Sequence, residues 1–286
     1  MSDSSAFDGA VDNGVCYRHP GRQSFVLCQR CGRTICGECQ TPAAVGFHCP
    51  ECIREARQNA PRVKSRVRVA MSPSSGVPVV TYSIMALCVV LWLAQVFIGD
   101  VVTAYLLYYP PLTLSEPWRM LTVAFVHSTA SPFHLLFNMY ALWLFGRILE
   151  QLLGRWRFLA LYLISGFGGS VAVLLLAPTS LVVGASGAVF GLFGAFFVIQ
   201  RRLGSGSMQL IVVIGINLVI GFVIPGISWQ GHVGGLIAGV LVGLVYMATR
   251  RAAQRNRQIL GVVGVIVLLL ALTVVGWMLL AARFGL

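Results

Sequence analysis

Charged residues are scarce in this chain. Only 10% of its 286 residues are Asp, Glu, Lys or Arg, whereas 57% are hydrophobic. A soluble domain carries roughly 25% charged residues, so the composition excludes an ordinary soluble fold over most of the length. From about residue 77 onward the chain is a series of apolar stretches of about 17–24 residues, the length that crosses a bilayer. The sequence therefore predicts an all-α polytopic membrane protein.

Acidic residues are the scarcest of the charged types, with 9 Asp and Glu against 21 Lys and Arg. A formal net charge of +12 is compatible with nucleic-acid binding. The basic residues, however, gather at the ends of apolar segments, where they set membrane orientation. We therefore expect no nucleic-acid partner. We also expect no signal peptide, because the N-terminal region is polar and cysteine-rich.

Seven membrane spans are predicted, at residues 78–98, 132–152, 157–177, 186–203, 208–225, 231–249 and 259–281. The loop of residues 99–131 is rich in aromatic residues and proline, which is typical of a segment lying in the membrane interface. With a cytoplasmic N-terminus, the outer flanks carry only Arg119 and Arg283. The inner flanks then carry Arg54, Arg57, Arg62, Lys64, Arg66, Arg68, Arg155, Arg157, Arg201, Arg202, Arg250, Arg251, Arg255 and Arg257. This bias predicts a cytoplasmic N-terminus and an extracytoplasmic C-terminus, and we expect a multi-pass protein of the plasma membrane.

Cysteine is almost absent from the membrane part, where Cys88 alone is interpreted as a small buried hydrophobe. The other cysteines form pairs with two residues between the members. The pairs are Cys16 with His19, Cys28 with Cys31, Cys36 with Cys39, and Cys49 with Cys52. Eight such ligands are enough for two tetrahedral zinc ions. Redox-active thiols are the alternative interpretation, but zinc explains all the spacings together.

Alternate pairs of this module are predicted to share a metal, 16/19 with 36/39 and 28/31 with 49/52, and His48 could replace a neighbouring ligand. Because so short a segment buries little core, metal binding is expected to supply most of its folding free energy. The module resembles a B-box-type zinc finger. We expect a protein partner of unknown identity, and a solvated basic face that could also contact anionic lipid, formed by Arg18, Arg22, Arg30 and Arg33.

Polar residues within the spans gather at one end of three of them. Span two begins with His134 and Asn138, span four with Ser186, and span six with His232. At about 1.5 Å per residue, all four lie within the first turns below the outer surface. Polar groups are costly inside a membrane and are usually functional. Interhelical hydrogen bonding, or simple packing around the serine, is the alternative interpretation.

The chemistry predicted for this group is that of a serine hydrolase. A histidine can take the proton that makes Ser186 nucleophilic, and donors from His134, Asn138 and the Ser186 N–H can stabilise an oxyanion. Asp and Glu are absent near Ser186 and His232, so we expect a Ser–His dyad without an acid. Small-residue faces would let spans four and six approach closely, through Gly187, Gly191, Gly235, Gly239 and Gly243.

Residues 78–250 resemble the rhomboid intramembrane serine proteases. The matching motifs are Trp118-Arg119, His134-x-x-x-Asn138, Gly184-Ala185-Ser186-Gly187 and His232-x-Gly234-Gly235. The resemblance implies a six-helix core plus a seventh C-terminal helix, with Ser186 as nucleophile and His232 as general base. It implies cleavage of single-pass membrane proteins in or next to their transmembrane segments, and no catalytic metal.

Three structural roles follow from the same resemblance. Trp118 and Arg119 belong to a structural loop, and Glu150 is expected to be the buried anchor of that loop. Phe190 stands where many relatives carry a tyrosine, so ring stacking on the histidine is kept and a hydroxyl is lost.

The predicted organisation has five parts: a disordered N-terminus at 1–14, the zinc module at 15–53, a basic linker at 54–76, the rhomboid protease core at 77–250, and a basic loop with the extra helix at 251–286. Two other classes of function remain. A catalytically silent rhomboid-like protein would bind or escort membrane proteins, and a transporter or channel would also place polar residues inside a helical bundle. The presence of Ser186 and His232 disfavours the first, and the lack of a polar path to the other membrane face disfavours the second.

Overall fold

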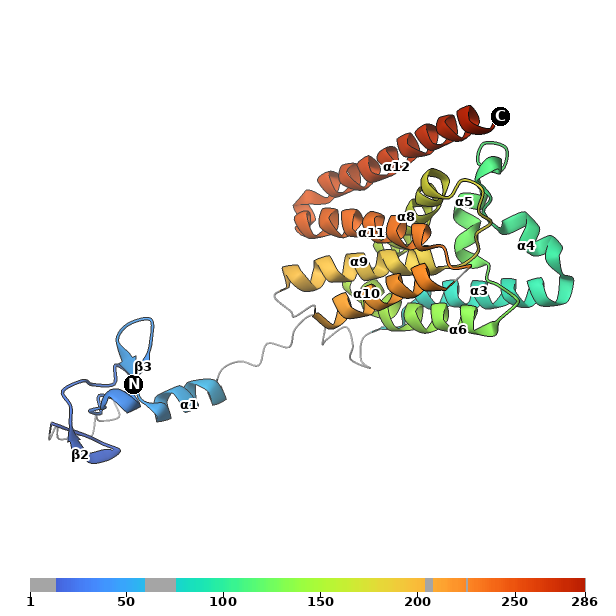
Figure 1. Cartoon of the computed structure of the whole chain (residues 1–286). Helices are drawn as coiled ribbons and strands as arrows, with labels where there is room; N and C mark the ends of the chain where they lie inside the picture. Colours follow the sequence, from blue (N-terminus) through green and yellow to red (C-terminus); the bar gives the residue numbers. More distant parts are fainter. Residues whose placement is uncertain (1–13, 60–75, 204–207, 225, 286) are drawn as a thin grey trace. The chain divides into compact units, whose positions relative to one another are not determined.

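The computed structural model describes residues 14–59, 76–203, 208–224 and 226–285 (Figure 1). The chain divides into two compact units, Met1–Lys64 and Ser65–Leu286. The N-terminal segment predicted to be disordered lies outside the described residues except for Gly14, and most of the predicted linker, residues 60–75, lies outside them as well.

The first unit is a small module of two hairpins and one helix. Strands β1 (Val15–Cys16) and β2 (His19–Gln23) pair antiparallel, as do β3 (Thr41–Pro42) and β4 (Phe47–His48). The 3₁₀ turn η1 (Gly37–Cys39) and the helix α1 (Pro50–Asn59) complete it. Its buried cluster consists of six cysteines and Ile35. A core with a single ordinary apolar side chain is too small to stabilise the fold alone. The helix also extends the module six residues past the predicted boundary at residue 53.

Among the described residues of the second unit, every regular element is a helix. Its α-helices are α3 (Val79–Ile98), α4 (Asp100–Leu106), α5 (Arg119–Thr122), α6 (Pro132–Ala141), α7 (Arg147–Leu153), α8 (Arg155–Leu176), α9 (Ser186–Arg202), α10 (Met208–Val223), α11 (Trp229–Ala248) and α12 (Arg255–Phe284). Short 3₁₀ turns lie between them at η2 (Pro110–Leu112), η3 (Val123–Phe125) and η5 (Ala252–Gln254), and a π-helical turn, η4 (Leu142–Gly146), joins α6 to α7.

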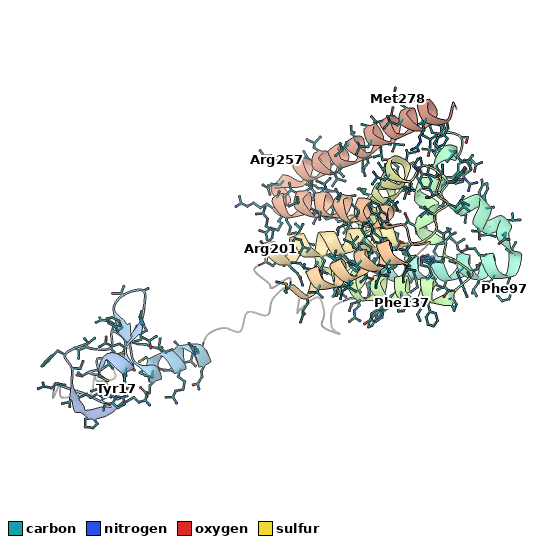
Figure 2. The ribbon with its side chains drawn as sticks, in the orientation of Figure 1. Tyr17, Phe97, Phe137, Arg201, Arg257 and Met278 are labelled. Carbon is teal, nitrogen blue, oxygen red and sulfur yellow. The ribbon has the colours of Figure 1, made fainter. Side chains whose placement is uncertain are left out.

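Each predicted span coincides with helical structure. Among the described residues, four helices are individually long and apolar enough to cross a membrane: α3, α8, α11 and α12. The other three predicted spans fall on α9, with 17 residues, on α10, with 16, and on the run from α6 to α7, which η4 interrupts. Large apolar side chains project outward from the bundle, including Phe97, Phe137 and Met278 (Figure 2). This surface suits lipid contact.

Helices α8 and α11 occupy the centre of the bundle. In the most apolar 18-residue stretch of each helix, 61% of the residues of α8 and 50% of those of α11 are buried. In α3 and in α12 the buried share is 22%. Helix α11 contacts α9, α8, α12 and α10. The hydroxyls of Tyr162 and Ser170 on α8 donate to the carbonyls of Ala124 and Met120, at 2.9 and 2.8 Å. Helix α8 therefore also holds the loop that precedes α6.

Glycines bring α9 and α11 into backbone contact. A Cβ on Gly235 would overlap the carbonyl oxygen of Gly187, and one on Gly239 would overlap that of Gly191. One turn further on, a Cβ on Gly243 would lie 3.0 Å from the Cα of Ala195. Contacts that advance by four residues on both helices mean that the two run parallel in fixed register. The predicted small-residue faces are thus confirmed, and they align the first turns of α9 and α11.

We expect Gly239→Ala to destabilise the membrane unit, because the added methyl meets backbone that rotamer changes cannot move. Overpacking of this kind costs about 1–3 kcal/mol. Thermal unfolding in detergent would show a lower Tm. Gly264→Ala on α12 is the matched control, because a Cβ there meets nothing within 4 Å and alanine favours a helix. An unchanged Tm for Gly239→Ala would contradict the close packing.

Candidate functional site

The structure brings Ser186 and His232 together. Ser186 is the first residue of α9, and His232 lies in the first turn of α11. Their Oγ and Nε2 atoms are 2.9 Å apart, within hydrogen-bond distance. The Ser186 side chain is half-buried and His232 is buried. A partly accessible hydroxyl paired with a buried imidazole is the arrangement that an activated serine requires.

The residues before each helix explain this placement. Val182 exchanges two backbone hydrogen bonds with Tyr108, and the Gly184 N–H donates to the carbonyl of Val123 at 3.1 Å. The first loop therefore holds the segment that leads into Ser186. At the other helix, the Ser228 hydroxyl accepts the N–H of Gly231 and caps α11. Both helix starts are thus fixed, and the N–H of Ser186 is among those that a helix leaves unpaired.

One aromatic ring supports the histidine. Phe190 stacks on His232 with ring centroids 4.2 Å apart and planes 10° from parallel. The predicted ring stacking is therefore present. Within the described part of the chain, His232 Nδ1 is buried without a hydrogen-bond partner. The imidazole is oriented by Ser186 on one edge and by Phe190 on one face.

His134 reaches the same place from α6. A Cβ built on Gly184 would lie 2.9 Å from His134 Nε2 and 3.7 Å from Ser186 Oγ. Gly184 has φ of +131°, a conformation that side chains rarely adopt, so this position needs glycine. Asn138 is buried one turn further along α6, and its amide donates to the carbonyl of His134 at 2.8 Å. The predicted residues His134, Ser186 and His232 therefore converge, whereas the hydrogen bond of the Asn138 amide stays within α6.

Sequence reasoning missed two buried residues beside this group. His127 is 0% exposed, and its ring lies edge-on to His134 with centroids 5.4 Å apart. Gln95, on α3, forms hydrogen bonds with both the N–H and the carbonyl of His127. The sequence did contain a signal for Gln95, since it is a lone amide inside an apolar span. Polar residues at such positions are costly and therefore usually have a role.

The loop motif has the structural role that the resemblance implied. The guanidinium of Arg119 is buried, pairs with Glu116 and donates to the carbonyls of Ala104 and Leu107. The indole of Trp118 lies against the ring of Tyr105, with centroids 5.5 Å apart. Together these contacts fasten α5 to α4.

The prediction that Glu150 anchors this loop is wrong. Its carboxylate accepts the N–H groups of Val80 and Thr81, at 2.9 and 2.7 Å, and the hydroxyl of Thr81 at 2.7 Å. Glu150 therefore caps the N-terminus of α3, where unpaired N–H groups and the helix dipole favour a carboxylate. Its role is structural, but it ties α7 to α3.

The cysteine module contains two groups of possible metal ligands. They are Cys16, His19, Cys36 and Cys39 in one, and Cys28, Cys31, Cys49 and Cys52 in the other. Within each group the ligand atoms lie within 4.8 Å of one another. The predicted pairing of alternate pairs is thus confirmed, and His48 belongs to neither group.

The donor atoms suit a tetrahedral metal. His19 Nδ1 lies 3.4, 3.5 and 3.8 Å from the sulfurs of Cys36, Cys39 and Cys16. Ligands about 2.3 Å from a tetrahedral zinc would be separated by roughly 3.8 Å. Burial raises the pKa of the Cys16 and Cys28 thiols, but backbone N–H groups, chiefly those of Cys36 and Cys49, outweigh it and lower both pKa values to about 6. These cysteines are therefore thiolates at neutral pH, the form that binds metal.

Three residues of the predicted basic face, Arg18, Arg22 and Arg30, are exposed as expected although each pairs with a glutamate, and the prediction is corrected only for Arg33. Arg22 pairs with Glu38 at 2.7 Å, Arg18 with Glu51 and Arg30 with Glu55. Arg33 is half-buried, and its Nε donates to the sulfur of Cys31 at 3.3 Å. Arg33 therefore lies beside the metal-ligand group and donates to one of its sulfurs.

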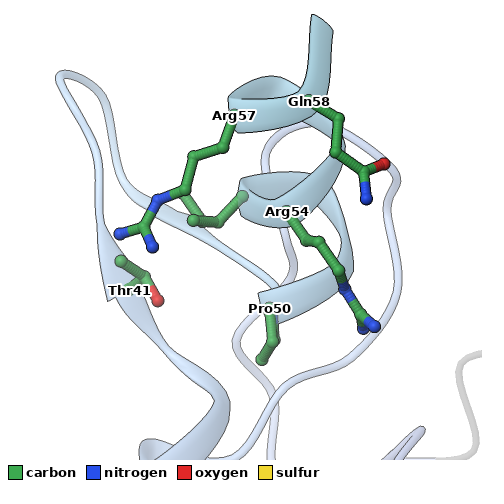
Figure 3. A pocket seen from close by; sticks show the side chains of 6 residues that line it. Thr41, Pro50, Arg54, Arg57 and Gln58 are labelled. Atoms are coloured by element: carbon green, nitrogen blue, oxygen red, sulfur yellow. The ribbon is translucent and has the colours of Figure 1, made fainter.

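A shallow hollow lies on the same module between α1 and β3. Its lining includes Pro50, Arg54, Arg57 and Gln58 from the helix, with Thr41 from the strand (Figure 3). Arg54 pairs with Glu51 at 3.5 Å. Figure 3 shows the Arg57 side chain extending toward Thr41. The hollow therefore has a basic rim.

Comparisons with known proteins point to one family. Residues 114–249 match the family model described as the Rhomboid domain. YdcA of Bacillus subtilis (strain 168), named as a candidate rhomboid protease, is 36% identical over 181 residues, which are 59% of this chain and 88% of YdcA. The Rhomboid protease GluP of the same organism is 35% identical over 176 residues, 58% of this chain and 34% of GluP.

RHOMBOID-like protein 1 of Arabidopsis thaliana is 40% identical over 150 residues, 50% of this chain and 38% of that protein. The chain thus spans about a third of the length of GluP and RHOMBOID-like protein 1, and most of YdcA. The chain belongs to the rhomboid family.

Paired cysteine variants test the metal-ligand assignment. Cys16→Ala with Cys36→Ala removes two ligands from one group, so we expect one of two bound metal equivalents to be lost. Cys16→Ala with Cys28→Ala removes one ligand from each group, so we expect less metal bound at both sites. Metal content of the purified protein, measured by mass spectrometry, separates the two variants. If instead the Cys16/Cys36 variant lost metal at both sites and the Cys16/Cys28 variant at one, neighbouring pairs would share a metal.

Proposed function

We propose that this protein is an intramembrane serine protease that cuts membrane proteins in or next to their transmembrane segments. The observation that carries the proposal is the 2.9 Å separation between Ser186 Oγ and His232 Nε2. Membership of a family that includes GluP, named a rhomboid protease, supports it. A silent relative that only binds membrane proteins would have no need of this contact.

The chemistry follows from the two side chains. His232 Nε2 takes the proton of Ser186 as Oγ attacks the scissile carbonyl carbon, and gives that proton to the leaving amine as the C–N bond breaks. Water then repeats the sequence on the acyl-enzyme and regenerates the serine. Phe190, stacked on the ring, favours the transient imidazolium through a cation–π interaction. No metal takes part in these steps.

The oxyanion that forms on the carbonyl needs donors beside Ser186. The Ser186 N–H, at the positive end of α9, is one. His134 Nε2 lies beside Gly184 on the side that faces Ser186 Oγ, and the Asn138 amide is a further donor one turn along α6. Each donor stabilises charge that is absent in the bound substrate, so it lowers the barrier without tightening substrate binding.

The orientation of the protein follows from its basic residues. Arg201 and Arg257 lie at one end of the bundle, where α9 ends and α12 begins (Figure 2). Ser186 and His232 lie at the opposite ends of their helices. By the positive-inside rule the N-terminus is cytoplasmic, the C-terminus is extracytoplasmic, and cleavage occurs near the outer face of the plasma membrane. The substrates are single-pass membrane proteins.

The N-terminal module binds two structural zinc ions and recruits a partner. Three thiolates with one imidazole, and four thiolates, are the ligand sets typical of structural zinc. The partner is a protein whose acidic residues meet Arg57 and the hollow between α1 and β3. Anionic lipid headgroups can engage the same basic residues.

Ser186→Ala and His232→Ala are each expected to abolish cleavage, because one removes the nucleophile and the other its base. The measurement is proteolysis of tagged single-pass polypeptides reconstituted with the protein in liposomes. Ser186→Ala should keep the wild-type Tm because it removes only a hydroxyl, whereas His232→Ala deletes a buried ring and its Tm is measured to show that the variant stays folded at the assay temperature. Turnover by either variant would refute the mechanism.

Asn138→Ala is expected to lower kcat by roughly 10²–10³-fold, the usual effect of losing one oxyanion donor. KM should stay constant, because the donor acts on charge developed in the transition state. The comparison is a full kinetic curve with the same liposome substrate. A wild-type kcat would make Asn138 a structural residue of α6.

A further inference from the structure

The protonation state of His134 can be read from its hydrogen bond. Its Nδ1 lies 3.1 Å from the backbone N of Ser128, which donates to it. A backbone N–H is always a donor, so Nδ1 must be the unprotonated nitrogen. The neutral ring then carries its proton on Nε2, because the bond made by one ring nitrogen decides the state of the other.

This tautomer is the one that an oxyanion donor needs. His134 Nε2 lies against Gly184, beside Ser186 Oγ. An N–H at Nε2 can donate to an oxyanion formed there, whereas the opposite tautomer would present a lone pair and repel it. The hydrogen bond from Ser128 therefore decides whether His134 can act at all.

The peptide unit that supplies this bond is held from α3. Its carbonyl belongs to His127 and its N–H to Ser128, and the unit is planar. Gln95 Nε2 donates to the carbonyl at 2.8 Å, and Gln95 Oε1 accepts the N–H of His127 at 3.1 Å. Gln95 is only 3% exposed. The buried Gln95 amide thus fixes the plane of the His127–Ser128 peptide unit, and this plane directs the Ser128 N–H toward His134.

Three further contacts tighten the same arrangement. Trp92, also on α3, donates its indole N–H to the Ser128 carbonyl at 3.2 Å. Gln95 Nε2 also donates to the hydroxyl of Thr103 at 2.9 Å, which fixes the amide orientation. The buried His127 ring packs edge-on against the His134 ring. Hydrogen bonds in series polarise one another, so the bond to Nδ1 gains from the bond to the carbonyl.

We propose that Gln95 is a positioning residue that sets the tautomer of His134 through the peptide unit between His127 and Ser128. This inference rests on the proposed protease function and assigns a role in it to α3, a helix outside the pair that carries Ser186 and His232. Gln95 touches no reacting atom. It acts by holding the N–H that keeps the His134 proton on Nε2.

The test compares Gln95→Met with Gln258→Met. Gln258 on α12 is a close match, because it is 6% exposed and its Nε2 also donates to a carbonyl and a threonine hydroxyl, both of Thr249. We expect Gln95→Met to lower kcat roughly tenfold with KM unchanged, less than the 10²–10³-fold cost of deleting a donor. Gln258→Met should keep the wild-type kcat.

A second measurement reads the tautomer directly. The ¹⁵N spectrum of histidine-labelled protein in lipid distinguishes protonated from unprotonated ring nitrogens, and the His134 signals are assigned by their loss in His134→Gln. We expect unprotonated Nδ1 and protonated Nε2 in the wild type, and mixed tautomers in Gln95→Met.

The outcomes separate this inference from the function on which it rests. A wild type with protonated Nδ1, or a Gln95→Met protein with wild-type tautomer and kcat, would overturn the role of Gln95 alone. Equal losses of kcat in both glutamine variants would make Gln95 a structural residue. Absence of cleavage by the wild type would refute the protease proposal, and the wild-type spectrum would still test the tautomer.

Discussion

The contact between α9 and α11 is the constraint on which the membrane unit depends. Gly235 and Gly239 meet the backbone of Gly187 and Gly191, and this spacing leaves no room for a side chain. In lipid, packing of small residues replaces the hydrophobic effect as the force between helices. The same contact sets the register that places Ser186 opposite His232, so the packing of the bundle and the proposed chemistry share one cause.

Around that pair, the structure supports the site from elements that carry none of the reacting atoms. Helix α8 holds the loop before α6 through the hydroxyls of Tyr162 and Ser170, and α3 holds its end through Trp92 and Gln95. Glu150 caps α3 itself. Buried polar groups are expensive in a membrane, so their repeated use to hold the loop before α6 indicates that the position of this loop matters.

Features with a local pattern could be predicted from the sequence, and features without one could not. The two-residue cysteine spacing and the four-residue glycine spacing predicted the metal clusters and the α9–α11 contact, because both repeats are visible along the chain. The partners of Glu150 lie 69 and 70 residues away, and Gln95 meets His127 across 32 residues. Such contacts depend on how helices pack. Arg33 was misjudged partly for the same reason, because one of its partner sulfurs, that of Cys49, lies 16 residues away in the sequence.

The central claim is that His232 activates Ser186, and a fluorophosphonate probe tests it without knowledge of any substrate. The probe forms a covalent adduct with an activated serine, which is the nucleophile that this mechanism requires. Mass spectrometry of the labelled, detergent-purified protein should place one adduct on Ser186, and the adduct should be lost in His232→Ala. A folded wild type that stays unlabelled, while GluP is labelled alongside, would contradict the claim and favour a silent member of the family.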